Sequence, residues 1–372
     1  MALSLQELYG SEVAENLKRG NNIGQYGDAV DAEPEAEAVV DPFTQIDIRT
    51  FEPEAGQKLF SELFWKPATI PDIPITVFSK TDWDVEAQLH IPDLDPNWVW
   101  NRKVTEAFAL AMHEGDTTLL HGLQGTGKTC LPMNWCATLN IPFWRMSCNR
   151  ETREAHFLGS PSVDYNEEGQ MYIKQEPTIL TDSLRYGGIF CEDESFRHNS
   201  ALVLQSLREK SNRTVLLPDA PGRTADERKL RAPTDKWWYV LTDNTTGSGD
   251  ETGIFDAEVQ DASTLDRIDS TIEVPYLGKA DERKILQNSS DLNADIINGM
   301  LDVAKLVRIA FRKQNMMSTM SVRGLLSWAN KTELMGNIGQ GLQLSFYNKL
   351  GTEDKKILED IFHQVFARKI TD

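Results

Sequence analysis

Eight residues at positions 122–129, with the sequence GLQGTGKT, constrain this chain more than any other segment. They fit the pattern G-x-x-x-x-G-K-[S/T], in which glycines let consecutive backbone N–H groups point at phosphate oxygens. The short apolar run 117–121 precedes the loop, and a helical pattern at 126–140 follows it. Because this pattern requires a strand before it and a helix after it, the segment predicts a nucleotide phosphate site.

The side chains of this loop have expected tasks. Lys128 would place its ammonium against the β- and γ-phosphates of ATP, and the Thr129 hydroxyl would coordinate Mg²⁺. Pro132 falls in the first helical turns, where backbone N–H groups lack intrahelical partners, so it is compatible with a helix that begins near Gly127. The expected nucleotide-binding residues are Gly122, Gln124, Gly125, Thr126, Gly127, Lys128 and Thr129.

A second segment, 189–194 (IFCEDE), is an apolar strand that runs into acids and resembles a Walker B element. We expect Asp193 to hold Mg²⁺ through water and Glu194 to polarise the attacking water. Glu192 stands where an apolar residue is expected, but we prefer Asp193 and Glu194, because Arg197 then lies three residues after the glutamate. The alternative interpretation is a solvated acidic end of a strand.

Strands and helices alternate from about residue 97, which predicts a parallel sheet with helices on both faces. The expected strands are 117–121, 141–148, 187–191 and 236–244, and a helix is expected at 104–115. From about residue 279 the apolar residues recur at three- and four-residue spacing, which predicts helices throughout. The predicted fold class is therefore α/β, a P-loop core with inserted hairpins followed by an α-helical lid and preceded by a small N-terminal module.

The N-terminal part differs in composition from the rest. The segment 28–42 is rich in Ala, Glu, Asp and Pro and is interpreted as a flexible acidic linker, with an acidic docking tail as the alternative. After it we expect a helix at 56–65 and a strand at 75–79. The predicted divisions are 1–41 for the N-terminal segment with its linker, 42–92 for the small module, 93–276 for the core and 277–372 for the lid.

Charge and cysteine usage exclude several classes of protein. The chain has 57 acidic and 38 basic residues, a net charge of -19, which disfavours binding to nucleic acid or to an anionic membrane. It shows neither an apolar run long enough to span a bilayer nor a secretory signal, so we expect a cytoplasmic protein. The four cysteines form no CxxC pair, which argues for reduced thiols and against a zinc site.

Three further segments complete a resemblance to the AAA+ ATPases of the MoxR/CobS branch, and within it to CobS-like, cobaltochelatase-like proteins. They are HIPDLDPNWVWN at 90–101, the segment 241–269, and STMSVRGLLSWA at 318–329. The most specific part, 243–253, is similar to the ANT-x-G-x-GD-x-TG segment of CobS-like proteins, with Asp243 where a small residue is expected. The resemblance covers about residues 70–335.

The resemblance implies roles for polar residues outside the two phosphate motifs. Asn244 matches the sensor-1 position, where an amide holds the attacking water. Arg267 matches the arginine finger, which acts on the nucleotide of a neighbouring subunit, and Arg323 matches sensor 2 on the lid. Arg197 is either a subunit-interface residue or an ordinary surface arginine. The hairpin expected at 162–175 is either a pore-facing insertion, as in relatives, or a plain surface hairpin.

The function implied by the resemblance is an ATP-hydrolysing motor. It would assemble with copies of itself into a ring, expected to be a homohexamer, and remodel or activate a partner protein. Relatives work with a von Willebrand factor A-domain protein, and some are ATPase subunits of metal chelatases. The alternatives are a nucleotide-gated assembly scaffold with little turnover and a DNA-remodelling ATPase, which the net charge disfavours.

Overall fold

The computed structural model describes residues 49–198, 201–217, 220, 224–249 and 258–370. From Arg49 onward the chain forms one compact unit. The predicted N-terminal segment 1–41 and its acidic linker lie outside the described residues. Among the helices of the described ranges, none is both long enough and apolar enough to cross a membrane.

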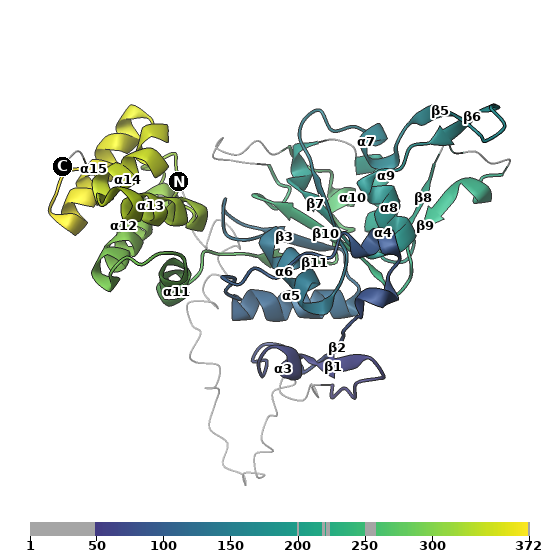
Figure 1. The fold of residues 1–372 in the computed structure, drawn as a ribbon, viewed down its shortest axis with the longest axis horizontal. Helices are drawn as coiled ribbons and strands as arrows, with labels where there is room; N and C mark the ends of the chain where they lie inside the picture. The colour runs from purple at the N-terminus through teal and green to yellow at the C-terminus, as the bar shows by residue number, and fades with distance from the viewer. Residues whose placement is uncertain (1–48, 199–200, 218–219, 221–223, 250–257, 371–372) are drawn as a thin grey trace, which may run out of the picture. The chain divides into compact units, whose positions relative to one another are not determined.

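A five-stranded parallel sheet forms the centre of the core, with the strand order β11–β3–β10–β7–β4. Four of these strands, β3, β7, β10 and β11, are labelled in Figure 1. Its strands are β3 (Thr118–His121), β4 (Phe143–Ser147), β7 (Gly188–Asp193), β10 (Trp237–Asp243) and β11 (Ser270–Glu273). All six residues of β7 are buried, which requires cover on both faces of the sheet. The predicted α/β core with a parallel sheet is confirmed, and β11 is a further strand that the sequence patterns did not indicate.

Three of the helices that cover the sheet are α5 (Arg102–Glu114), α6 (Cys130–Leu139) and α8 (Ile179–Tyr186). The helix α5 begins after Asn101, whose Oδ1 accepts from Val104 N–H at 3.4 Å, and it ends at Gly115 in the left-handed conformation. These are the residue types that favour the start and the end of a helix.

The helix after the phosphate loop begins three residues later than expected. Its first bond runs from Leu131 N–H to Gly127 O at 2.9 Å, while residues 127–129 remain in a turn. Pro132 therefore lies within the first turn of α6, where its missing N–H costs no intrahelical hydrogen bond.

The other α-helices in the described part of the core are α4 (Val85–Gln88), α7 (Glu154–Leu158), α9 (Ala201–Arg208) and α10 (Ala262–Leu265).

The residues before the core fold differently from the expected helix. The segment expected as a helix at 56–65 contains β1 (Gln57–Leu59) and only one helical turn, α3 (Phe60–Leu63). The strand β1 pairs antiparallel with β2 (Pro74–Thr76), so pairing between distant residues overrides the local helical spacing. Several apolar side chains of this N-terminal region are buried in the same hydrophobic cluster as the residues of the sheet, including Phe60, Ile73 and Ile75.

Two antiparallel hairpins are inserted in the core. The first consists of β5 (Pro161–Tyr165) and β6 (Met171–Gln175), joined by the turn that the sequence predicts (Figure 1). The second consists of β8 (Thr214–Leu216) and β9 (Lys229–Arg231). Part of the segment that joins these two strands lies outside the described residues.

The C-terminal part is helical, as predicted. Its helices are α11 (Lys279–Ser289), α12 (Ala294–Arg312), α13 (Val322–Met335), α14 (Ile338–Ser345) and α15 (Thr352–Phe366). They enclose a second hydrophobic cluster of their own, with Trp328 and Phe362 fully buried. The helix α13 is preceded by its N-cap residue Ser321, whose side chain accepts from the N–H of Gly324.

Candidate functional site

The phosphate loop, residues 122–129, leaves the carboxyl end of β3 and leads into α6. Its three glycines have φ angles of 149°, 73° and 96°, which side-chain-bearing residues rarely adopt. A Cβ at Gly122 would lie 2.4 Å from Val274 O, and one at Gly125 would lie 2.3 Å from Ser321 Cβ. Glycine is therefore required twice, once for the turn itself and once for the close approach of α13.

Lys128 lies folded back into this loop. Its ammonium donates to Gly122 O at 2.8 Å, to Leu123 O at 3.0 Å and to Asn244 Oδ1 at 2.9 Å. Burial lowers the pKa of Lys128 to about 8, although nearby carboxylates act in the opposite direction. A cation held only by neutral oxygens can exchange them for the charged oxygens of a phosphate, which would restore its usual pKa.

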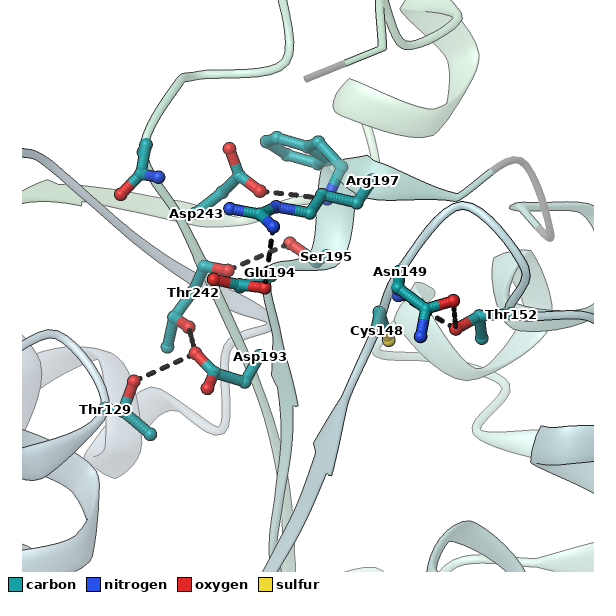
Figure 2. A network of polar contacts seen from close by, with 12 residues as sticks. Thr129, Cys148, Asn149, Thr152, Asp193, Glu194, Ser195, Arg197, Thr242 and Asp243 are labelled. Atoms are coloured by element: carbon teal, nitrogen blue, oxygen red, sulfur yellow. Dashed lines mark hydrogen bonds and ion pairs between the residues drawn. The ribbon is translucent and has the colours of Figure 1, made fainter. Parts of the chain in front are cut away.

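Beside the loop, a carboxylate and two hydroxyls meet (Figure 2). Thr129 Oγ1 donates to Asp193 Oδ1 at 2.9 Å, and the Thr242 hydroxyl donates to the same oxygen. Arg145 donates to the other oxygen, Oδ2, from Nε at 3.0 Å and from a terminal nitrogen. Burial favours a higher pKa for Asp193, but the hydrogen bonds from Thr242, Arg145 and Thr129 outweigh it and hold the pKa below its ordinary value.

Glu194 follows directly after β7 in a left-handed conformation, with φ 59° and ψ 45°. Such a conformation is uncommon for a glutamate and is often found at functional sites. Its side chain is 43% exposed and pairs with Arg197 Nη1 at 3.1 Å (Figure 2). The turn is fixed from β10, because Asp243 Oδ2 accepts from the N–H of Phe196 at 3.0 Å. Glu194 therefore has a fixed backbone and a side chain that solvent reaches.

Glu192 points away from this site. Both of its oxygens accept from Arg208 at 3.0 Å, and Tyr239 and His198 also contact it. Burial favours a higher pKa for Glu192, but Arg208 and the hydrogen bonds lower it to about 2. Its use in this network explains why an acid is tolerated where an apolar residue is expected, and favours Asp193 and Glu194 as the site acids.

The same network contains a trio with metal-ligating atoms within 4.8 Å of one another, Cys148, Glu192 and His198. Arg208 already supplies the positive charge that a cation would bring. Burial also raises the pKa of Cys148 well above its usual value, so the thiol stays protonated. We therefore interpret this trio as part of a structural network.

The structure brings Asn244 to the phosphate loop, since its side chain contacts Lys128. Asp243, which stands where the resemblance predicts a small residue, accepts from the N–H and the hydroxyl of Thr245 at 2.9 and 3.0 Å. It thus fixes the end of β10 on which Asn244 sits, as well as the turn that carries Glu194.

The two remaining arginines lie farther out. Arg267 is partly exposed after α10, and its guanidinium donates to the carbonyl of Ser263 in the same segment. Arg323 is exposed at the second position of α13, and its charge acts on Cys130, the first residue of α6. Their expected roles at a neighbouring subunit and over the nucleotide remain predictions.

Several residues at the site were not expected from the sequence. Arg145 and Thr242 contact Asp193, and Tyr276 donates to Gln124 O at 2.9 Å. Trp98 approaches the loop, since a Cβ at Gly127 would lie 3.2 Å from its ring. The signal for Arg145 was present as a lone cation in the middle of an apolar strand, but its partner depends on which strand lies beside β4.

The residues present fit a nucleotide with a divalent cation. The loop offers backbone N–H groups and an ammonium to phosphate oxygens. The Thr129 hydroxyl and the Asp193 carboxylate, 2.9 Å apart, are the hard oxygen ligands that Mg²⁺ prefers.

Residues 117–267 match the family described as AAA domain (dynein-related subfamily). The chain is 23% identical to the aerobic cobaltochelatase subunit CobS of Sinorhizobium sp over 309 residues, which cover 81% of this chain and 89% of that protein. Among solved structures, similarity is found to the RuvB Holliday junction branch migration motor of Thermotoga maritima, with 13% identity, a TM-score of 0.38 and coverage of 71% of this chain and 74% of that one. Another is a putative ATPase from Cytophaga hutchinsonii, with 15% identity, a TM-score of 0.36 and coverage of 76% and 92%.

Proposed function

This chain contains an AAA domain of the dynein-related subfamily and is related to CobS, and on that premise we propose that it is an ATP-hydrolysing ring motor that acts on a partner protein. One observation carries the proposal. Lys128, Thr129, Asp193 and Asn244 come from three separate segments and meet within hydrogen-bond distance at the carboxyl edge of the sheet. Ligands bind at this edge in open α/β sheets.

The loop and Lys128 bind the triphosphate. The glycine backbone wraps the β-phosphate, and Lys128 leaves the two loop carbonyls to contact the β- and γ-oxygens. Asn244 then loses its contact with Lys128, and its amide is free to hold the attacking water. Glu194, whose side chain is partly exposed, accepts a proton from that water.

Thr129 and Asp193 would hold Mg²⁺, directly through the hydroxyl and through water at the carboxylate. When bound, the cation would neutralise charge on the β- and γ-oxygens. The Thr242 hydroxyl keeps Asp193 oriented, since it donates to the same oxygen as Thr129 does.

Two further arginines complete the proposed site. Arg323 reaches the nucleotide from α13, which the close approach of Ser321 to Gly125 brings next to the phosphate loop. Arg267 of the adjacent subunit supplies charge to the γ-phosphate, so hydrolysis requires a ring. By the CobS relationship we extend the proposal to a von Willebrand factor A-domain partner or to service as a metal-chelatase ATPase subunit.

Phosphate release by the purified chain, with Glu194→Gln beside it, tests hydrolysis. We expect wild type to release phosphate with Mg²⁺, and the variant to bind a fluorescent ATP analogue as well as wild type but to turn over at least about 100-fold more slowly. Glu167→Gln, an exposed residue in the turn of the first hairpin, makes the same charge change away from the site and should match wild type. Equal inactivity of wild type and Glu194→Gln, with or without partner, would favour the scaffold.

A mixing experiment tests the shared site. Glu194→Gln and Arg267→Ala chains are each expected to be inactive alone. In a randomly mixed ring, about one quarter of the interfaces would combine an intact Glu194 with an intact Arg267, so about a quarter of wild-type phosphate release should return. No recovery on mixing would show that Arg267 does not act across subunits.

A further inference from the structure

The site described above contains a cation that neither the phosphate motifs nor the proposed mechanism uses. Arg145 contacts Asp193 through two nitrogens, Nε at 3.0 Å and a terminal nitrogen, both on Oδ2. Thr129 and Thr242 both donate to the other oxygen, Oδ1 (Figure 2). Both oxygens of this carboxylate are therefore engaged. Asp193 is thus paired with a cation and hydrogen-bonded at both of its oxygens.

The position of Arg145 follows from the strand register. Arg145 lies opposite Cys191 and Ser147 lies opposite Asp193, so the arginine reaches diagonally across two residues of β7. Diagonal neighbours on parallel or antiparallel strands are within range of long side chains only. The guanidinium therefore approaches Asp193 from the neighbouring strand β4, through a side chain that is half exposed to solvent.

Exposure differs sharply between the two partners. The Arg145 side chain is 52% exposed, whereas that of Asp193 is only 10% exposed. An ion pair in which one side chain is half exposed to solvent adds little to the stability of the folded chain. It does, however, remove the cost of an unpaired buried carboxylate in a crowded acidic region, since Glu192, Glu194 and Asp243 are all nearby in the sequence or the sheet.

A divalent cation at Thr129 and Asp193 changes this balance. Water molecules bound to the cation would donate to this carboxylate, whose Oδ2 Arg145 now occupies, and the two like charges repel at this range. We propose that Arg145 is the resident counter-ion of Asp193, displaced when the cation binds with nucleotide, so that Arg145 sets the Mg²⁺ concentration at which the site fills. This inference rests on the proposed nucleotide-binding function and adds a residue that competes with the metal.

The test compares wild type, Arg145→Gln and Arg145→Lys. Arg185→Gln on α8 removes the same charge from an exposed position and serves as the control. Binding of mant-ADP is followed by fluorescence, first in EDTA and then as Mg²⁺ is added. The readout is the Mg²⁺ concentration that gives half of the Mg²⁺-dependent change, which is a binding measurement and needs no turnover.

We expect Arg145→Gln to bind mant-ADP in EDTA as wild type does and to need about fivefold less Mg²⁺. Arg145→Lys keeps the charge but loses the contact through two nitrogens, so its Mg²⁺ requirement should lie between those of wild type and Arg145→Gln. An unchanged or higher Mg²⁺ requirement in Arg145→Gln overturns the inference, and if that variant does not fold, the same reading of Arg145→Lys decides. A wild-type chain that binds no mant-ADP at any Mg²⁺ concentration overturns the proposed function and this inference with it.

Discussion

Asn244 Oδ1 lies 2.9 Å from Lys128 Nζ, so the end of β10 is tied directly to the phosphate loop. The two residues are 116 positions apart and meet because β10 lies beside β3 in the sheet, with Asp243 opposite His121. In this structure the amide oxygen of Asn244 accepts one of the three hydrogen bonds that the Lys128 ammonium can donate. Any ligand that draws Lys128 away also releases Asn244, which links phosphate binding to the residue expected to hold water.

Substitution of Asn244 should separate binding from turnover. Asn244→Ala removes the water-holding amide but leaves Lys128 two carbonyl partners, so we expect nucleotide affinity to change little and phosphate release to fall about 100-fold. Asn244→Asp should instead weaken ATP binding by about tenfold, because a carboxylate at this position holds Lys128 and repels the γ-phosphate. Equal losses of affinity in both variants would contradict this division.

Nucleotide affinity should depend on pH through Lys128. Its pKa is about 8 in the free protein, and a bound phosphate raises it, so above pH 8 binding must take up a proton. Affinity for mant-ADP is therefore expected to hold below pH 8 and to fall by up to about tenfold per pH unit above it. Calorimetry in two buffers of different ionisation enthalpy would report the proton uptake. Lys128→Arg stays charged and should lose this pH dependence, and a flat profile for wild type would count against the low pKa.

Asp243 should stabilise the turn that carries Glu194. It is 4% exposed and accepts from Phe196 N–H and from Thr245 N–H and hydroxyl. Asp243→Ala leaves the buried Phe196 N–H and the partly buried Thr245 donors unpaired, and it is expected to lower the free energy of unfolding by about 1–3 kcal/mol, measured by urea titration. Asp243→Asn keeps one acceptor oxygen and should lose less. If Asp243→Asn lost as much free energy of unfolding as Asp243→Ala, the negative charge of Asp243 and not its acceptor oxygens would account for the stabilisation.

The buried pair of Glu192 and Arg208 should dominate the acid sensitivity of the core. Glu192→Gln leaves the buried guanidinium without a counter-charge and should cost about 3–5 kcal/mol at pH 7. Since the pKa of Glu192 is lowered to about 2, its contribution is present above the unfolded value near 4.5 and is lost as the pH falls from there toward 2. Wild type and variant should therefore converge in acid, measured as urea unfolding at pH 7, 5 and 3.5.

A second substitution serves as the control for this prediction. Arg208→Met in the Glu192→Gln background removes the stranded charge and should restore much of the lost stability. A Glu192→Gln variant as stable as wild type at pH 7 would show that the network contributes little to stability. It would also weaken the conclusion that Glu192 serves this network and not the nucleotide site.

The local sequence pattern was sufficient to predict the structure of segments whose conformation depends only on residues close together in the chain. The spacing of residues 122–129 needs only glycine conformations and a following helix, and the C-terminal helices follow from apolar periodicity alone. The same reasoning failed at 56–65, where helical spacing is present but Gln57–Leu59 pairs with Pro74–Thr76. Pairing with a distant strand supplies hydrogen bonds that the local pattern does not reveal.

The sequence by itself determined the phosphate loop, the acidic strand end and the α/β class, because each depends on residues close together in the chain. Only the tertiary structure decided that Asp193 and not Glu192 faces Thr129, and that Arg145 rather than solvent neutralises it. Alternate residues of a strand point to opposite faces, but strand order determines what each face meets. That order, β3–β10–β7–β4, is fixed by packing over the whole sheet.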